Sequence, residues 1–161
     1  MAAPQIAQTT RYINPATTKL LLVPSISDIT APTRLELDAG LDVTREVAEV
    51  AGWMLQGEAV PTPDLASLFT GSITGRTSVE NSSVTYYMDR AGDDIRSLSE
   101  VGTDTNVVWM DGGDVTGYFM DVYPVRILSA GKSRSVEAQP GRMTVSYSIT
   151  RSPAVDVEIP A

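Results

Sequence analysis

The side chains that most often carry out catalysis are absent from this chain or give weak signals. Its 161 residues include no cysteine and no histidine. This removes thiolate nucleophiles, zinc sites built from Cys and His, and acid–base schemes that use imidazole. Glycoside hydrolysis needs only two suitably spaced carboxylates, but with twenty acidic residues some such pair is always available. We therefore expect no enzymatic activity and no cofactor.

The remaining motifs fail on spacing or on context. Gly131-Lys132-Ser133 resembles the end of a phosphate-binding loop, but the first glycine of that motif would fall on Arg126. The acidic segment 89–94 lacks the alternating oxygen ligands and the closing glutamate of a calcium loop, so we expect no metal site. Trp53 and Trp109 stand in apolar stretches, which is more typical of core residues than of a sugar-binding platform.

The charge balance argues against nucleic acid or membrane as a tightly bound partner. The net charge is −8, and the acidic residues are spread along the chain without forming a tail. The longest aliphatic run, Leu20 to Val23, is far shorter than the ~20 residues of a membrane span. The first residues do not resemble a secretory signal. We expect a single domain over residues 1–161, folded in the cytosol and not inserted in a membrane.

Strand signals dominate the chain. Two short helices are expected, over 33–40, where Thr33 and Glu36 have capping-box spacing, and over 93–102. Strands are expected over 19–23, 47–55, 68–76, 82–89, 106–111, 118–128 and 142–150. The segment 111–114, Asp-Gly-Gly-Asp, is typical of a hairpin turn. The fold class is therefore mainly β.

Several strands alternate apolar residues with small hydroxyl residues. An ordinary half-solvated strand carries Lys and Glu on its outer face more often, although such a strand remains an open alternative. The hydroxyl positions are Thr70, Ser72, Thr74, Ser83, Thr85, Thr144, Ser146 and Ser148.

Three segments lack regular periodicity. They are an N-terminal arm (1–18), an extended loop (57–67) and a C-terminal arm (152–161). Such segments are commonly mobile in a monomer, and a polymerising subunit uses them to reach its neighbours. The loop region contains prolines and apolar residues that are unusual in a free loop. The candidates for contact with a neighbouring subunit are Val60, Pro61, Pro63, Asp64, Leu65 and Leu68.

Nearly the whole chain resembles the major tail tube proteins of long-tailed bacteriophages (siphoviruses) that infect actinobacteria. No single motif is diagnostic, and the resemblance rests on the order of many short segments. These segments are 9–15 (TTRYINP), 31–40 (APTRLELDAG), 50–53 (VAGW), 61–65 (PTPDL), 92–96 (GDDIR), 111–114 (DGGD), 120–125 (MDVYPV) and 149–153 (ITRSP). Leu20 to Leu22 is more aliphatic than expected for that family.

The resemblance implies a β-sandwich or barrel-like tail tube fold with one or two short helices. It also implies hexameric rings stacked around a tape measure protein, with tail-end proteins as further partners, in a virion assembled in the host cytoplasm. Phage DNA would pass through the lumen during ejection without tight binding. The hydroxyl positions then become lumen candidates, and the residues of the 57–67 loop region become ring-stacking candidates. The alternative is another virion role, as a head decoration or head–tail connector subunit.

Overall fold

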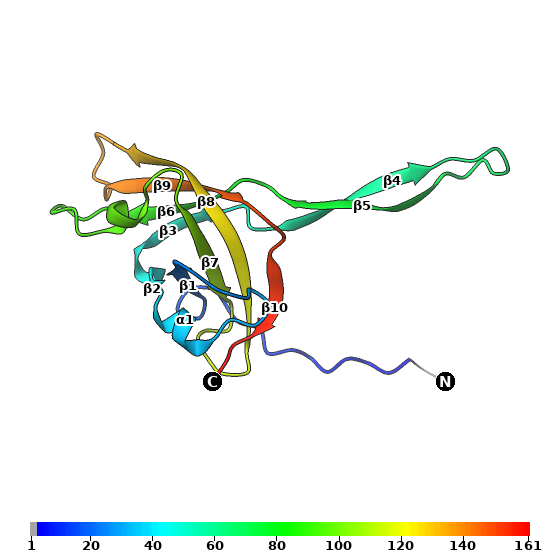
Figure 1. The fold of residues 1–161 in the computed structure, drawn as a ribbon, viewed down its shortest axis with the longest axis horizontal. Helices are drawn as coiled ribbons and strands as arrows, with labels where there is room; N and C mark the ends of the chain where they lie inside the picture. The colour runs from blue at the N-terminus through cyan, green and yellow to red at the C-terminus, as the bar shows by residue number, and fades with distance from the viewer. Residues whose placement is uncertain (1–2) are drawn as a thin grey trace.

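The computed structural model describes residues 3–161 and confirms a mainly β fold (Figure 1). Helices are short: α1 (Arg34–Asp38), and the 3-10 turns η1 (Thr44–Glu46) and η2 (Ile95–Leu98). None of the helices in residues 3–161 is long and apolar enough to cross a membrane. The strands are β1 (Lys19–Val23), β2 (Leu41–Asp42), β3 (Val47–Ala51), β4 (Leu55–Thr62), β5 (Gly71–Val79), β6 (Ser82–Tyr87), β7 (Asp104–Met110), β8 (Phe119–Ser133), β9 (Arg142–Ile149) and β10 (Ala154–Glu158).

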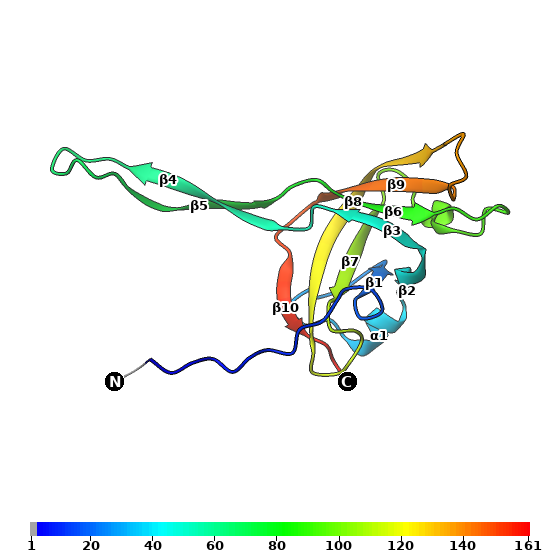
Figure 2. The same ribbon diagram turned by 180° about the vertical axis from the view of Figure 1, so that it is seen from behind.

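Eight of the strands form one antiparallel sheet. Their order is β2-β1-β7-β8-β9-β6-β3, and β10 pairs with the first half of β8. The other two strands, β4 and β5, pair only with each other in a hairpin that projects far from the body of the molecule (Figures 1 and 2). The chain therefore leaves the sheet after β3, forms the hairpin of β4 and β5, and returns as β6, which pairs with β3.

The eight-stranded sheet curls around the larger of two apolar cores. Strands far apart in the strand order, β1 and β6, both contribute buried side chains to it. Trp53 lies at one end of this core, in edge-to-face contact with Trp109 (5.7 Å between ring centroids) and with Tyr123 (5.2 Å). The hydroxyls of Tyr86 and Tyr147 bond to each other at 3.0 Å, so neither is left unpaired in the core.

The second core lies on the other face of the same sheet, under α1 and the C-terminal segment. Leu37 of α1 and Ile159 are fully buried there against β1, β7 and the first half of β8. The predicted capping box is present, because the Thr33 hydroxyl accepts from the Glu36 amide and the Glu36 carboxylate accepts from the Thr33 amide. Apolar cover is thus confined to one half of this sheet face.

The structure differs from expectation in the segments judged irregular. Residues 57–62 of the predicted loop belong to β4, and only residues 63–70 form the connection to β5. Pro61 is tolerated because both strands of an isolated ribbon have a free edge, where a missing N–H costs no ladder bond. The 152–161 arm contains β10, which packs on β8. The helix expected over 93–102 shortens to the single turn η2.

Candidate assembly surfaces: the hydroxyl face and the projecting hairpin

Five of the eight predicted lumen residues lie together on one face of the sheet, which we call the hydroxyl face. Antiparallel register places Ser83 opposite Ser146 and Thr85 opposite Thr144, on the side facing away from the larger core. The hydroxyls of Thr85 and Thr144 lie 2.9 Å apart and bond to each other. Ser148 continues the row along β9 and lies opposite Arg126 of β8. This face is the half of the sheet that α1 and the C-terminal segment leave uncovered.

Two arginines lie among these hydroxyls, and each is paired with a carboxylate. Arg142 bonds to Glu49 at 2.7 Å, and Arg126 makes two bonds to Asp104 at 2.7 and 2.9 Å. The guanidinium of Arg126 lowers the pKa of Asp104, so that carboxylate stays ionised. Both cations are therefore already neutralised by a neighbour on the same surface.

The hydroxyl face is bounded by two free strand edges. On one side, β3 pairs with β6, and no strand of the described part of the chain lies on its other edge. On the other side, β7 pairs with β8 only as far as Arg126. Within residues 3–161, the segment 128–133 of β8 pairs with β9 alone, and its residues are exposed. Unpaired edges of this kind are templates for pairing with another chain.

The other three lumen candidates, Thr70, Ser72 and Thr74, lie on the hairpin and not with the first five. Ser72 pairs with Pro61, and Thr74 pairs with Ala59, on one face of the ribbon. The opposite face carries apolar side chains, with Val60 opposite Ile73. Both faces are largely exposed along the ribbon, and its root is anchored by Val79, which packs against the larger core.

The tip of the hairpin presents large apolar side chains in a fixed turn. Leu65 and Leu68 are as exposed as in an extended chain (109% each), and Phe69 is 80% exposed. The turn is held by Asp64, whose carboxylate accepts from the amides of Ala66 (2.8 Å) and Ser67 (3.1 Å). Exposed apolar clusters of this kind usually mark a contact with another molecule. The ring-stacking candidates Val60, Pro61, Pro63, Asp64, Leu65 and Leu68 are all on this hairpin.

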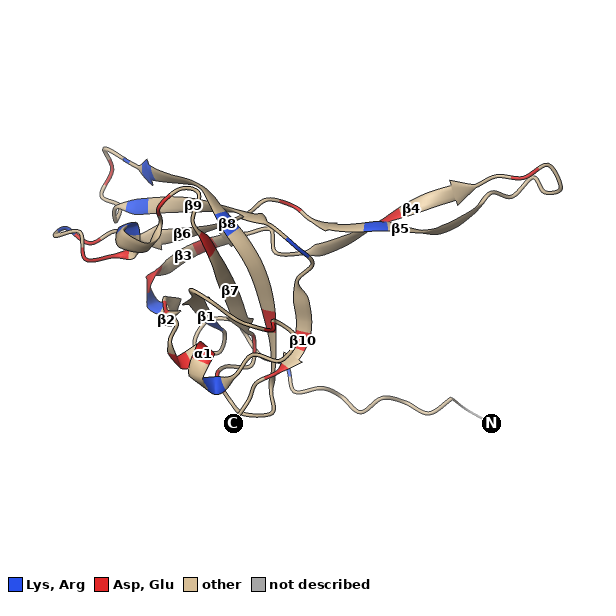
Figure 3. Ribbon diagram, viewed as in Figure 1, with Lys and Arg blue, Asp and Glu red and all other residues tan. Residues whose placement is uncertain are grey.

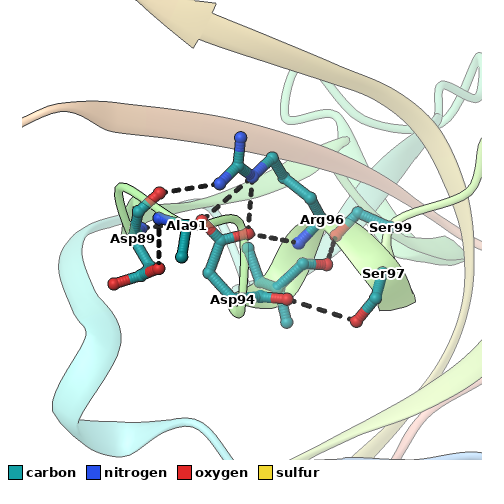
Figure 4. Close-up of polar contacts among 7 residues, drawn as sticks. Asp89, Ala91, Asp94, Arg96, Ser97 and Ser99 are labelled. Carbon is teal, nitrogen blue, oxygen red and sulfur yellow. Dashed lines mark hydrogen bonds and ion pairs between the residues drawn. The ribbon is translucent and has the colours of Figure 1, made fainter.

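The acidic segment 89–94 uses its polar groups internally (Figure 4). Asp94 accepts from the side chain and the amide of Arg96, and this pairing lowers its pKa to about 2. Arg96 also donates to the Asp89 carbonyl at 2.7 Å, and the Asp89 carboxylate accepts from the Ala91 amide at 2.6 Å. These carboxylates stabilise their own loop, and residues 3–161 contain no cluster of metal-ligand side chains.

Sequence reasoning missed the four charged residues of the hydroxyl face. Glu49 and Arg142 are 93 positions apart, and Asp104 and Arg126 are 22 apart. Nothing in their local spacing indicates pairing, since each contact exists only once the strand register is set. Knowledge of the register alone would have been enough to find them.

Comparison with solved structures supports the same architecture. A chain of the solved structure described as "Cryo-EM structure of the anti-feeding prophage (AFP) baseplate, 6-fold symmetrised" shares this fold with a TM-score of 0.56 at 10% identity, over 95% of both chains. A type six secretion system protein is less similar, with a TM-score of 0.41 at 15% identity over 83% of this chain and 78% of that chain. Comparison with curated protein sequences finds no match.

The family is shown by the sequence itself. Residues 6–161 match the profile of the family described as "Phage tail tube protein". The match begins within the N-terminal arm and includes the projecting hairpin, both free edges and the C-terminal strand. This chain therefore belongs to the phage tail tube protein family.

Proposed function

We propose that the chain folds as one domain and assembles into hexameric rings, which stack into the tube that conducts phage DNA into the host. The observation that carries this proposal is the pair of free edges that bound the hydroxyl face. If β3 of one copy pairs with residues 128–133 of the next, the sheets β3-β6-β9-β8 of all copies join into one barrel. Closing the ring pairs both edges that bound the hydroxyl face, and full closure is one way in which β proteins avoid uncontrolled pairing.

In this arrangement the hydroxyl face lines the lumen. A conduit must not hold its cargo, because each phosphate contacted by a free Lys or Arg adds salt-dependent affinity. Small hydroxyls give no stacking surface for bases, and Arg126 and Arg142 are already paired with carboxylates. The lumen residues are then Ser83, Thr85, Thr144, Ser146 and Ser148. Thr70, Ser72 and Thr74 instead belong to the hairpin that contacts neighbouring copies.

The projecting hairpin joins one ring to the next. Its tip is preorganised by Asp64, so little conformational entropy is lost when it docks. Leu65, Leu68 and Phe69 supply the apolar area that the contact buries. A chain of the same fold also occurs in the sixfold-symmetrised baseplate of the anti-feeding prophage, which is consistent with a ring of six.

The remaining elements of the proposal follow from the resemblance in the sequence. The tube encloses a tape measure protein, is closed by tail-end proteins, and assembles in the cytoplasm of the host cell. The order of short motifs from Thr9 to Pro153 supports a phage of the siphovirus group that infects actinobacteria.

Electron microscopy of the concentrated protein tests this function directly. The proposal expects rings with six subunits and open-ended tubes with a continuous central channel. A small closed oligomer that decorates preformed capsids, and never polymerises alone or on a tail-end complex, would instead identify a head decoration or connector subunit. Tubes whose channel wall lacks β6 and β9 would contradict the lumen assignment.

A further inference from the structure

A groove lies beside the root of the N-terminal arm. It consists of two adjoining hollows that share Asp111 and Asp121 as a common wall. The larger, of about 660 Å³, is lined mainly by apolar and aromatic side chains, including Trp53, Met54 and Trp109. The smaller, of about 320 Å³, continues past the two aspartates toward Tyr118 and Phe119. Both of these aromatic rings are more than half exposed.

The groove is acidic. Asp111 and Asp121 stand in its common wall. Burial raises the pKa of Asp121 and the carboxylates of Asp111 and Asp156 raise it further, against the opposing effect of the Asp156 amide, which donates to Asp121 at 2.9 Å. Among the described residues that line the two hollows, none is Lys or Arg. An occupant with apolar side chains and a positive charge would complement this lining.

The N-terminal arm has properties that complement those of the groove. Residues 3–13 are exposed, adopt no regular structure, and make no hydrogen bond to the rest of the described chain. Ile6 is 94% exposed. The arm extends outward on the same side as the hairpin (Figures 1 and 2).

The charge of the arm is also opposite to that of the groove. In a chain of net charge −8, the first acidic residue is Asp28, whereas Arg11 lies within the arm. Figure 3 accordingly shows no acidic residue along the arm. The extended backbone carbonyls and the Gln and Thr side chains of residues 5–10 add further hydrogen-bonding groups.

We propose that this groove binds the N-terminal arm, residues 3–11, of a second copy of the chain, with Ile6 among the aromatic side chains and Arg11 beside Asp111 and Asp121. The proposal names the partner of a contact between subunits and thus rests on the proposed function. The arm of each copy leaves from the wall of its own groove, since Tyr12 and Asn14 line the two hollows. Each copy therefore offers an arm and a groove side by side, so identical contacts can repeat without limit along an assembly.

Two other occupants fit less well. The hairpin tip has the necessary apolar residues, but it carries Asp64, whose charge has the same sign as those of Asp111 and Asp121. The arm of the same chain is directed outward from its own groove, and residues 14–18 are held in a turn by bonds from the amides of Thr17 and Thr18 to the Asn14 carbonyl.

Intrinsic fluorescence reports occupancy of this groove directly, because the chain has only two tryptophans and both line it. A synthetic peptide of residues 1–11 is titrated into the full-length protein at a concentration where it is monomeric. We expect a saturable change in tryptophan emission. Replacing Ile6→Asp in the peptide should abolish the change, and Arg11→Glu should weaken binding on the order of tenfold or more, since a favourable charge contact becomes a repulsion.

Protein variants locate the site. Met54→Asp places a charge on a 70% exposed groove residue and should remove peptide binding, while Val136→Asp, at a fully exposed position outside the groove, should not. No saturable change, or equal responses from all peptides or from both variants, overturns the proposal. The emission of the full chain is also compared with that of a chain lacking residues 1–11. If the two differ in the monomer, independently of concentration, the arm binds the groove of its own chain and the proposal is overturned. Tubes without peptide binding refute this inference alone, and peptide binding without tubes refutes the proposed function alone.

Discussion

Glu49 and Arg142, on strands β3 and β9, meet at 2.7 Å across the intervening strand β6. Their contact spans the hydroxyl face at the place where a free arginine would offer a phosphate group a binding site. Asp104 and Arg126 form a second such pair, directly opposite each other on the adjacent strands β7 and β8. The carboxylates thus hold the two cations of this surface in place and neutralise them.

Removing these carboxylates should create DNA affinity. We predict that Glu49→Gln combined with Asp104→Asn leaves the fold intact, since exposed ion pairs contribute at most about 1 kcal/mol each. The two freed arginines should give duplex binding whose affinity falls with salt, with a log–log slope of up to about −2. Fluorescence anisotropy with labelled duplex at several salt concentrations measures it. The control Glu100→Gln with Glu137→Gln changes net charge equally at exposed positions away from this face. Equal DNA binding by both double variants would show that only net charge matters.

Gly52 should be intolerant of a side chain for two separate reasons. Its φ is +86°, which disfavours other residues, and a Cβ would lie 2.6 Å from Ser82 Oγ and 2.9 Å from Ser82 Cα. That serine hydroxyl accepts from the Trp53 amide, so a displacement reaches the aromatic core. We predict that Gly52→Ala lowers the free energy of unfolding by about 2 kcal/mol or more. Gly102 has a φ of +88° and open space around it, so Gly102→Ala isolates the backbone cost. It should lower the free energy of unfolding by less, as measured by the same urea titration.

Local sequence patterns predicted two kinds of element: those stabilised by residues close in the sequence, and strands whose apolar and polar residues alternate clearly. The strand at 19–23 and the capping box at Thr33 and Glu36 are confirmed by β1 and α1. The 57–67 segment was misread because Pro61 and Pro63 usually indicate a loop, and proline in an isolated ribbon is the exception. The strand β10 was missed because it is short, irregular in register and stabilised by its contact with β8.

The capping box should make stability depend on pH in the acid range. Hydrogen bonds from Thr33 and Ser27 lower the pKa of Glu36 from 4.5 to about 2. The ionised carboxylate therefore stabilises the folded state above its unfolded pKa, and this contribution disappears as pH falls from about 5 to about 2. Glu36→Gln should reduce the urea midpoint of unfolding at pH 6. The midpoints of the variant and of the unmodified protein should converge near pH 2. Glu100→Gln, at an exposed position, is the control. A constant difference across this range would contradict the assignment.

The candidate site was predictable only in part. Alternation along β6 and β9 identified Ser83 to Thr85 and Thr144 to Ser148 as hydroxyl rows, and strand pairing places these two rows side by side. The same alternation in 70–74 selected residues of the hairpin, because periodicity indicates the face of a strand and not the sheet to which it belongs. The paired charges and the groove at Trp53 depend on long-range register, which no local pattern encodes.

Shortening the hairpin should separate folding from assembly. Replacing residues 58–76 by a Gly-Ser turn removes the outer part of the ribbon and keeps its root, where Val79 packs against the larger core. Both cores lie outside it, so the melting temperature of the monomer should change little. Negative-stain electron microscopy of the concentrated protein should then find rings or monomers and no tubes. The finer variant Leu65→Ser, Leu68→Ser, Phe69→Ser keeps the ribbon and removes only the apolar tip.

The comparison between these two variants locates the stacking contact. Loss of tubes in both assigns the contact to the apolar tip, since burial of each such side chain contributes about 1.5–3 kcal/mol per copy. Loss only on shortening assigns it to the ribbon face that carries Val60 and Ile73. Val101→Ser with Val136→Ser, which removes exposed apolar groups elsewhere, should leave tubes unchanged. Tubes of normal length from the shortened protein would exclude the hairpin from ring stacking, because no residue of the proposed contact would remain.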